Sequence, residues 1–345
     1  MRATELLTVS WKDNAVVMID QTKLPNKLEF VKCTSYEQVA DCIKKLVIRG
    51  APAIGAAAAM GLALAAVKSK AKTPNELMRE LETAFQVLRG TRPTAVNLFW
   101  ALERVMQKAR GQSSVKTIKD AVLNEALMVA KEDISANKQM GSFGAALIED
   151  GDVVLTHCNA GALATVAYGT ALGVLRAAKE KGKRINVIAT ETRPVLQGAR
   201  LTAFELKHDG IDVTVAPDTA VGSLMARGMI KKVIVGADRV LRTGHVFNKI
   251  GTYQVAILAN KHKIPFYVAA PVSSFDLKSG PDQVTIEERS FDEVTGMGGT
   301  RVVPKGVRVF NPAFDVTPPE LISGIITEKG VLNPPYDMSI KTLLG

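Results

Sequence analysis

The segment VVLTHCNAGALAT, residues 153–165, passes from an apolar run into a thiol, an amide and a glycine. The apolar run predicts a buried strand, and Gly161 predicts a turn that leads into a helix. In an open α/β sheet, ligands bind where the carboxyl ends of strands meet the amino ends of helices, whose amide groups attract anions. Cys158 therefore stands where chemistry is expected, although a buried free cysteine is more commonly inert.

The chain beyond Gly151 alternates short apolar runs with helical patterns. The predicted strands are residues 152–156, 185–190, 211–215, 232–236, 265–269 and 307–310. Helical patterns fill the gaps at residues 163–180, 198–209, 219–228 and 251–263. This alternation predicts an α/β fold with a doubly wound, mostly parallel sheet.

The first part of the chain, residues 1–145, is predicted to form a mainly helical domain with a small β element. Strands are expected at residues 14–19 and 27–33, and helices at 35–47, 52–68, 73–88 and 94–110. A long helical pattern at 117–149 is expected to join this domain to the second one, which spans residues 146–345.

The chain carries a net charge of +10, from 44 basic and 34 acidic residues. Because the basic residues are scattered and aromatic residues are few, we predict no nucleic-acid partner, and a basic surface suits an anionic small substrate. The longest apolar run, residues 53–67, is too short to span a bilayer, and the amino terminus lacks the apolar core of a signal peptide. We therefore expect a cytoplasmic protein without a membrane segment.

Cysteine and glycine patterns limit the cofactors that the chain is expected to use. Cys33, Cys42 and Cys158 are widely spaced and form neither a disulfide framework nor a zinc pattern. The sequence contains no Walker A loop and no GxGxxG fingerprint, so a nucleotide cofactor has no support. We therefore predict neither a metal site nor a nucleotide-cofactor site.

A second predicted strand, residues 232–236, also leads to a functional side chain, that of Asp238. A carboxyl held against apolar walls has a raised pKa and can act as an acid near neutral pH, although Asp238 could instead cap a turn or pair with Arg239. The segment NKIGT, residues 248–252, supplies an amide, a cation and a glycine turn that suit a phosphate. Lys249 alone could equally be a surface lysine.

Arginines stand beside three further turns. Arg49 precedes the helix predicted from residue 52, Arg92 precedes the helix predicted from residue 94, and Arg193 follows the strand at 185–190. The planar guanidinium binds two phosphate oxygens together, whereas capping or salt bridging is the simpler role for the first two arginines taken alone. Polar groups thus follow three predicted strands, and we expect these strand ends to share one crevice.

His157 adjoins Cys158, but neighbours on an extended strand point to opposite faces of the sheet. A nucleophilic pair formed by these two residues is therefore not expected. We predict instead that the imidazole of His157 is packed or hydrogen-bonded.

Assembled in order, these motifs closely resemble those of the methylthioribose-1-phosphate isomerases. The resemblance covers nearly the whole chain. It rests on RGAPAIG (49–55), TRPTAVNL (91–98), HCNAGALAT (157–165), ETRPVLQGARLTA (191–203), GADR (236–239), NKIGT (248–252) and NPAFDVTPPELI (311–322). The loop expected at residues 239–247 departs from the commoner wording of the family.

The resemblance implies a helical amino-terminal domain, a Rossmann-like carboxyl-terminal domain and a homodimer. It also implies interconversion of 5-methylthioribose 1-phosphate and 5-methylthioribulose 1-phosphate, a step of methionine salvage, without a cofactor. By position, Cys158 and Asp238 correspond to the catalytic pair of the family. The residues that correspond to its substrate-binding groups are Arg49, Gly50, Ala51, Arg92, Gln197, Asn248 and Lys249.

Phosphate on the anomeric oxygen prevents the sugar from opening to a free aldehyde, so the reaction needs an acid at the ring oxygen. Our hypothesis is that Asp238 is this acid, and that Cys158 either relays a proton or stabilises a hydride shift. The nearest alternative enzyme is a ribose-1,5-bisphosphate isomerase, which needs a second cationic cluster. A third alternative is a non-enzymatic regulatory subunit of a translation-initiation exchange factor, which would need neither Cys158 nor Asp238.

Overall fold

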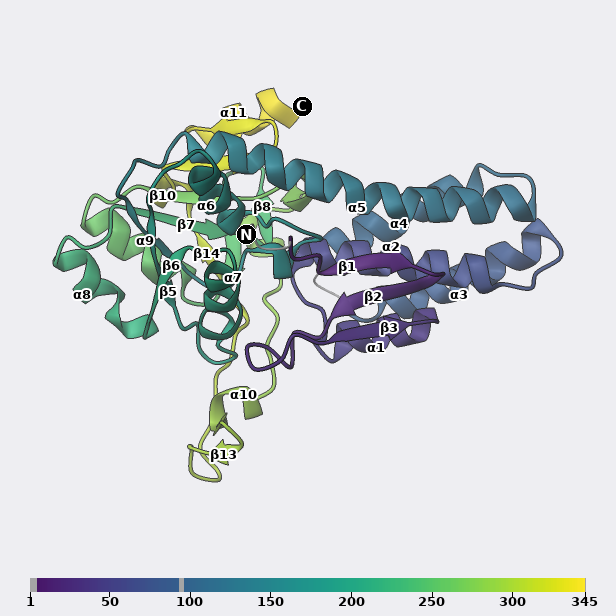
Figure 1. Ribbon diagram of the computed structural model, residues 1–345, viewed down its shortest axis with the longest axis horizontal. Coiled ribbons are helices and arrows are strands. Elements are labelled where there is room, and N and C mark those ends of the chain that lie inside the picture. Colours follow the sequence, from purple (N-terminus) through teal and green to yellow (C-terminus); the bar gives the residue numbers. More distant parts are fainter. Residues whose placement is uncertain (1–4, 93–95, 345) are drawn as a thin grey trace. The chain divides into compact units, whose positions relative to one another are not determined.

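Residues 5–92 and 96–344 are described in the computed structural model, and they fall into two units (Figure 1). The first unit comprises the chain up to Gln139 together with Ala160–Gly173. The second comprises Met140–Asn159 and the chain from Val174 onward. The domain boundary predicted between residues 145 and 146 stays a prediction, because this division does not show which segments fold on their own.

The first unit begins with an antiparallel sheet and continues as helices. The strands are β1 Val9–Lys12, β2 Ala15–Ile19 and β3 Phe30–Cys33, in that order across the sheet. The helices are α1 Tyr36–Lys44, α2 Ala51–Lys68, α3 Pro74–Arg89, α4 Val96–Arg110 and α5 Val115–Ala145, whose last residues belong to the second unit. The expected helical region is confirmed, and the predicted start of the fourth helix at residue 94 lies outside the described residues.

Helix α2 forms the centre of the first core. Its alanines leave little side-chain bulk, so neighbouring helices approach its backbone closely, and Ala56–Ala59 are inaccessible to solvent. Among the described residues, α2 is the one helix long and apolar enough to cross a membrane, but 72% of it is buried inside the protein. Such burial identifies a core helix of a globular unit.

The second unit contains a sheet of seven strands in the order β16-β15-β10-β7-β4-β5-β6. The strands are β4 Val153–Thr156, β5 Asn186–Thr190, β6 Asp212–Ala216, β7 Lys232–Gly236, β10 Phe266–Ala269, β15 Gly324–Thr327 and β16 Gly330–Leu332. All neighbours are parallel except β15 and β16. Counted from β4, the six parallel strands follow the Rossmann order 3-2-1-4-5-6, so the prediction of a doubly wound sheet is confirmed.

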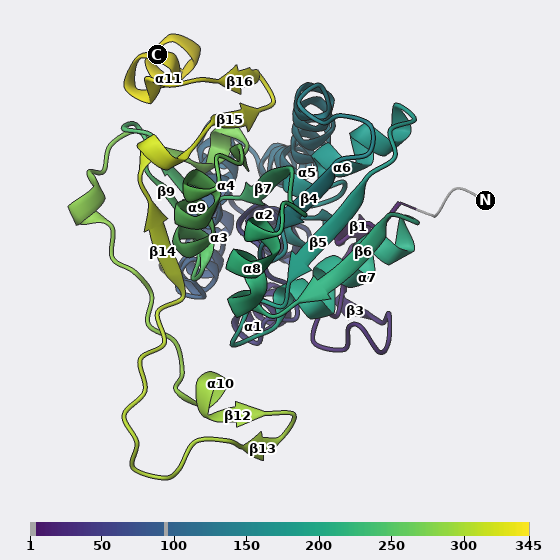
Figure 2. The ribbon, with the colours of Figure 1, turned by 90° about the vertical axis from the view of Figure 1, so that its left-hand side faces the viewer.

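Helices cover this sheet on both sides, as the doubly wound topology requires. Figure 2 shows α8 Val221–Ala226 and α9 Thr252–Lys261 on one face of the sheet, with α7 Ala203–His208 on the other. The switch between the two windings falls between β4 and β7, which pair through Leu155 and Val233. Ligands bind at the carboxyl edge of such a switch point.

A second sheet, which the sequence did not predict, adjoins the carboxyl end of β7 in the chain. It has the order β11-β8-β9-β14, with bounds Phe275–Asp276, Arg239–Leu241, Val246–Lys249 and Phe314–Thr317. Strands β8 and β9 form a hairpin where a loop was expected at residues 239–247. This hairpin fixes the position of the residues that follow β7.

The strand predicted at residues 307–310 is wrong. These residues lie in an arm, residues 284–312, which leaves the second unit as two extended legs and carries α10 Asp292–Thr295 (Figure 2). Val307 and Phe310 are 52% and 76% exposed, so their apolar pattern reflects surface rather than core. The sixth parallel strand is instead β15, a buried run that begins at Gly324 and that the sequence analysis did not single out.

The helix predicted at residues 163–180 is also wrong over its first half. A 3-10 turn at Ala162–Ala164 follows Cys158, and α6 begins only at Ala171. Tyr168 has a left-handed φ of +70°, which ends any helix, and the amide of Leu172 bonds to the carbonyl of Ala160. No α-helix amino end therefore follows Cys158 directly, and Ala160–Gly173 belongs to the first unit.

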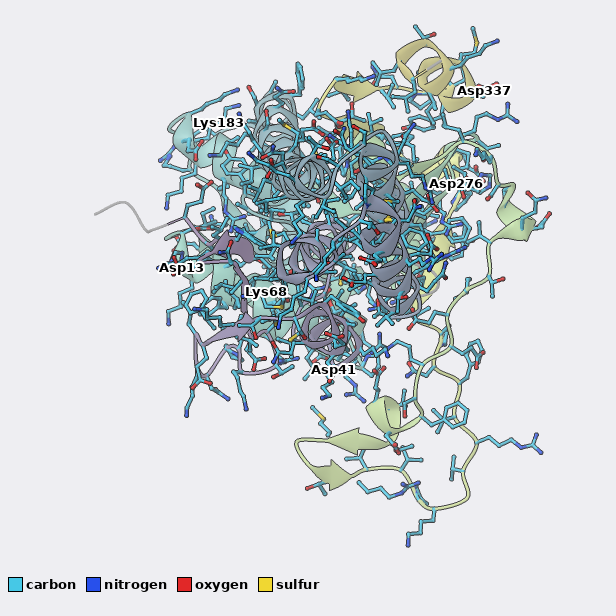
Figure 3. The ribbon with its side chains drawn as sticks, turned by 90° about the vertical axis from the view of Figure 1, so that its right-hand side faces the viewer. Asp13, Asp41, Lys68, Lys183, Asp276 and Asp337 are labelled. Atoms are coloured by element: carbon cyan, nitrogen blue, oxygen red, sulfur yellow. The ribbon has the colours of Figure 1, made fainter. Side chains whose placement is uncertain are left out.

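Charged side chains are dispersed over the surfaces of the two units. Figure 3 shows Asp13, Asp41 and Lys68 on the outside of the first unit and Asp337 on the outside of the second, and all four are exposed. This spread agrees with a solvated basic surface rather than with one concentrated patch.

Candidate active site

The end of β4 carries Cys158 in a constrained backbone conformation. Its φ is +64°, which is uncommon for any residue with a side chain, and the residue is 8% exposed. Its N–H donates to Thr192 Oγ1 at 2.8 Å, and its carbonyl accepts from Thr202 Oγ1 at 2.6 Å. These two hydrogen bonds hold the strained backbone and so set the direction of the thiol.

The imidazole of His157 is fully engaged by other residues. Its Nδ1 lies 2.6 Å from Thr190 Oγ1, and its Nε2 lies 2.8 Å from the carbonyl oxygen of Ile250. Burial is the main cause that lowers the pKa of this side chain. The prediction that His157 is hydrogen-bonded is confirmed. The extended backbone assumed for its neighbour is not, because Cys158 is left-handed.

The loop after β5 is held from the end of β6. Asp218 accepts hydrogen bonds from the amides of Thr192 and Arg193, each at 2.7 Å. Thr192 has a left-handed φ of +64°, which is rare for a β-branched residue. Strained residues persist only where the surroundings over-determine them, and they cluster at functional sites.

Gln197 stands at the end of the same loop, before the π-helical turn Gly198–Thr202. A Cβ at residue 198 would overlap the carbonyl oxygen of Thr190, so only glycine allows this approach to β5. Gln197 is buried, and its Oε1 has no hydrogen-bond partner within the described part of the chain. A buried amide oxygen left in that state costs about 1–3 kcal/mol, which a bound hydroxyl would recover.

The end of β7 carries Asp238, which is half-buried. Its N–H donates to the carbonyl of Phe247 at 2.9 Å, so the residue lies against β9. The next two residues of β9 are Asn248 and Lys249, both buried. The backbone of Asp238 is therefore paired with the strand that carries the two residues that the sequence singled out, Asn248 and Lys249.

Lys249 is oriented by the strand and helix on either side of it. Its Nζ lies 4.7 Å from the centre of the Phe314 ring on β14, a favourable cation–π geometry. Thr252 Oγ1 donates to the carbonyl of Lys249 at 2.6 Å and accepts from Asn248 Nδ2 at 3.0 Å. The start of α9 thus fixes both residues.

Asp315, which the sequence analysis did not single out, caps α9. Its carboxylate accepts from the amide of Gly251 at 2.7 Å and from the amide of Tyr253 at 3.1 Å. Burial raises the pKa of Asp315 to about 6, against these hydrogen bonds and the charge of Lys249, which lower it. The available signal was an acidic residue at the fifth position of the otherwise mostly apolar run NPAFDV, residues 311–316.

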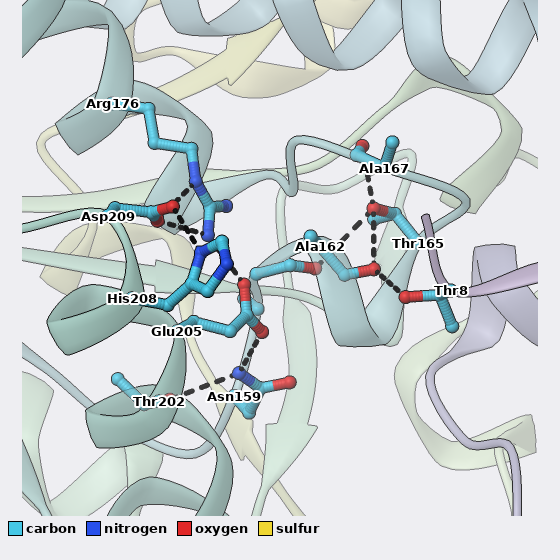
Figure 4. Close-up of polar contacts among 12 residues, drawn as sticks. Thr8, Asn159, Ala162, Thr165, Ala167, Arg176, Thr202, Glu205, His208 and Asp209 are labelled. Carbon is cyan, nitrogen blue, oxygen red and sulfur yellow. Dashed lines mark hydrogen bonds and ion pairs between the residues drawn. The ribbon is translucent and has the colours of Figure 1, made fainter. Parts of the chain in front are cut away.

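A buried ionic network lies next to the end of β4 (Figure 4). We call this strand end, with Cys158, the Cys158 corner, and the end of β7, with Asp238, the Asp238 corner. Glu205 Oε1 accepts from Asn159 Nδ2 at 2.8 Å, and Glu205 Oε2 pairs with Arg176 at 2.7 Å. Arg176 also pairs with Asp209. Glu205 is inaccessible to solvent, so the part of this network that supports the loop after β4 is shielded from bulk water.

The segment 247–250 connects the two corners. The carbonyl of Phe247 bonds to Asp238, and the carbonyl of Ile250 bonds to His157, which precedes Cys158. Both corners lie at the carboxyl edge of the strands that flank the switch point. The structure therefore brings five predicted site residues to this edge: Cys158, Gln197, Asp238, Asn248 and Lys249.

The other predicted site residues lie in the first unit. Arg49 and Gly50 precede α2, which begins at Ala51, and the carbonyl of Gly50 accepts the first helical hydrogen bond from Ile54. Arg92 follows α3 and is half-buried, and the next three residues lie outside the described ranges.

In the described ranges, no three His, Cys, Asp or Glu side chains form a group that could hold a metal ion.

Comparison with known proteins identifies the class. Residues 47–334 match the Initiation factor 2 subunit family. The chain is 56% identical over 339 residues to the methylthioribose-1-phosphate isomerase of Thermosipho africanus, and the alignment covers 98% of each. The chain belongs to the family of methylthioribose-1-phosphate isomerases.

Two crystal structures of relatives share the fold throughout. The 5-methylthioribose 1-phosphate isomerase of Pyrococcus horikoshii is 46% identical, with a TM-score of 0.93 and coverage of 99% of this chain and 97% of that one. A chain from A. fulgidus, described as the delta subunit of translation initiation factor eIF-2B, is 52% identical, with a TM-score of 0.89 and coverage of 98% and 99%. The isomerase has the higher TM-score and the A. fulgidus chain the higher identity, and their descriptions assign different functions to the two proteins.

Proposed function

We propose that this protein interconverts 5-methylthioribose 1-phosphate and 5-methylthioribulose 1-phosphate as a cofactor-free isomerase. The single observation that carries the proposal is the meeting of two strand ends at segment 247–250. The end of β4 contacts this segment through His157, the neighbour of Cys158, and the end of β7 contacts it through the backbone of Asp238, next to the strand that holds the buried Lys249. A scaffold that only binds other subunits needs no such combination.

Asp238 acts as the acid in this proposal. It donates its proton to the ring oxygen, the bond between that oxygen and C1 breaks, and C1 becomes electron-poor while it keeps the phosphate ester. The hydrogen on C2 then moves to C1, and the proton of the C2 hydroxyl returns to Asp238, which leaves a ketone at C2. A positioned acid of this kind contributes roughly 10²- to 10⁴-fold to the rate.

Cys158 faces the hydrogen transfer between C2 and C1 in this proposal. In one route the thiol relays a proton through an enolate-like species. In the other, hydrogen moves directly as hydride, and Cys158 stabilises the polarised state. The left-handed backbone of Cys158, held on both sides, supports a role that depends on direction.

Substrate binding is assigned to the remaining predicted residues. Lys249 supplies a positive charge, and the amide oxygen of Gln197 can accept a hydrogen bond from a hydroxyl group of the sugar. We assign phosphate binding to Arg49, with the amides of Gly50 and Ala51, and to Arg92. Fixing the sugar in a reactive orientation can contribute on the order of 7–11 kcal/mol.

The test is turnover of 5-methylthioribose 1-phosphate by purified variants. We expect Asp238→Asn to lower kcat by about 10²- to 10⁴-fold and Cys158→Ser to lose most activity, with substrate still bound by both. Cys42→Ser is the matched control, because it makes the same change at a buried cysteine of the first unit. Near wild-type turnover by Asp238→Asn would end the assignment of the acid.

A regulatory subunit is the second candidate, because the similar A. fulgidus chain carries a translation-factor description. This role predicts no turnover of any sugar 1-phosphate and stable association with heterologous subunits. The same wild-type assay decides between the two functions, since measurable isomerisation contradicts a purely structural subunit.

We further propose that the protein is a homodimer. The arm supports this proposal, because five of its apolar side chains are at least half exposed: Phe291, Met297, Val302, Val307 and Phe310. Light scattering should give about twice the chain mass of 37.0 kDa. Phe310→Ser should weaken association, whereas Phe30→Ser, at another exposed aromatic position, which lies on β3, should not. A monomeric wild type would refute the proposal.

A further inference from the structure

We infer that His157 is a positioning residue. It connects Cys158 to Ile250, the residue that follows the substrate-binding pair Asn248 and Lys249, through a series of hydrogen bonds whose donors all face the same way. The inference rests on the proposed function, since it explains how two neighbouring strand ends keep a reactive geometry. It concerns a residue that is not expected to touch the substrate.

The hydrogen-bonded chain has four links. The amide of Cys158 donates to Thr192 Oγ1 at 2.8 Å. Thr192 Oγ1 lies 3.2 Å from the carbonyl oxygen and 3.3 Å from the Oγ1 of Thr190. Thr190 Oγ1 lies 2.6 Å from His157 Nδ1, and His157 Nε2 lies 2.8 Å from the carbonyl oxygen of Ile250.

The two ends of the chain fix its direction. A backbone carbonyl can only accept, so the proton of the imidazole must be on Nε2, facing Ile250. A neutral imidazole has one N–H, so Nδ1 accepts and the hydroxyl of Thr190 donates to it. Thr190 is then left as an acceptor for Thr192, which in turn accepts from the amide of Cys158. Every hydrogen thus points from Cys158 toward Ile250.

The surroundings of His157 maintain this neutral tautomer. Burial lowers its pKa, and the charge of Lys249 acts in the same direction, while Asp218 opposes them. A second proton on Nδ1 would face Thr190 Oγ1 and force that hydroxyl to turn away. The one-way order of donors therefore requires neutral His157, because a protonated Nδ1 would donate to Thr190 Oγ1 and reverse that hydrogen bond.

Packing makes the imidazole a spacer as well as a link. A Cβ at Gly251, whose φ is +101°, would lie 2.9 Å from His157 Cε1. The ring therefore rests directly on the backbone that follows Lys249. Because the amide of Gly251 is held by Asp315, a displacement of the ring is passed to the start of α9. Both strand ends depend on one side chain.

The experiment compares two substitutions of His157. His157→Phe keeps the ring but removes both hydrogen bonds, and His157→Gln keeps a donor for Ile250. We expect His157→Phe to lower kcat by about 10- to 100-fold, the loss that a displacement of about 1 Å produces, with a smaller change in KM. His157→Gln should recover most of it. His262→Phe, at an exposed histidine, is the matched control.

A second pair of variants covers the case in which His157→Phe does not fold. Thr190→Val removes one hydroxyl of the chain at constant shape, and we expect it to lower kcat severalfold. Thr156→Val makes the same change on the neighbouring strand, at a buried hydroxyl with no partner among the described residues, and should leave kcat unchanged.

The reactivity of the Cys158 thiol provides a readout that does not depend on turnover. We expect Thr190→Val and His157→Phe to change the rate of its alkylation by iodoacetamide at least threefold, measured by peptide mass spectrometry. If wild-type protein isomerises the sugar but these variants keep wild-type kcat and alkylation rate, the inference is wrong and the proposed function stands. If wild-type protein turns over no sugar 1-phosphate while the alkylation rates change, the function falls and the link between the corners stands.

Discussion

Replacing Asp315 by asparagine should change how the stability of the second unit depends on pH. Burial raises the pKa of this carboxyl from its ordinary value of 3.8 to about 6. Folding therefore favours the protonated form, and the stability associated with that form is fully present below about pH 3.8. It is lost as the pH rises to about 6, where the folded protein must hold a buried carboxylate.

The size of the effect follows from the two pKa values. One pKa unit corresponds to 1.36 kcal/mol, so a rise from 3.8 to about 6 amounts to about 3 kcal/mol. Between pH 4 and pH 6.5, wild-type protein should lose about 2 kcal/mol of this stability relative to Asp315→Asn. The variant gives up part of the cap on Gly251 and Tyr253, so its curve should start lower and show no such fall.

The assay must report the second unit. Both tryptophans, Trp11 and Trp100, lie in the first unit, so intrinsic fluorescence would follow the wrong part of the chain. Hydrogen exchange of the α9 amides, corrected for intrinsic rates, gives the free energy of opening at each pH. Asp337→Asn, at an exposed carboxylate, is the control. Parallel pH curves for wild type and Asp315→Asn would refute the reasoning.

Three further predictions follow from the same unit. Gly198→Ala should prevent accumulation of folded protein, because the new methyl group would overlap the carbonyl of Thr190. Gly222→Ala, where the added methyl group would make only ordinary contacts, should express normally, and equal soluble yields of the two variants would contradict this. Glu205→Ala should lower the free energy of unfolding by about 3–5 kcal/mol, because it leaves Arg176 buried without its main partner, and denaturant titration that shows a loss below about 1 kcal/mol would count against it. Isomerisation in deuterated water should place solvent deuterium at C1 if Cys158 relays a proton and none if hydride moves, which NMR of the product distinguishes.

The parallel sheet was predictable because its strands are buried on both faces. Val233, Ile234 and Val235 form a continuous apolar run that needs no partner to be recognised, and the structure gives β7 the predicted bounds, residues 232–236. The positions of Cys158 and Asp238 follow from that pattern, since each comes directly after such a run. Local sequence therefore located the carboxyl edge of the sheet.

Features that depend on distant partners escaped prediction. Strand β9 pairs with β14, which lies more than sixty residues further along the chain, beyond the arm. The residues of β9 alone therefore show no strand pattern that local sequence could reveal. The cap supplied by Asp315 comes from that same returning strand. Tyr168 takes a left-handed conformation that no local rule predicts for tyrosine, and this ended a helix that periodicity had favoured.

The route of Ala160–Gly173 has a consequence for any attempt to dissect the protein. This stretch lies between two segments of the second unit but packs in the first. Val166 is part of the first core, and carbonyl groups of the stretch accept hydrogen bonds from Thr8 and Gln21. A single cut near residue 140 would strip the amino-terminal fragment of part of its own interior and leave the other fragment with an orphaned apolar insert. The two units should therefore be expressed together as one chain. An isolated amino-terminal half would need residues 160–173 added to it.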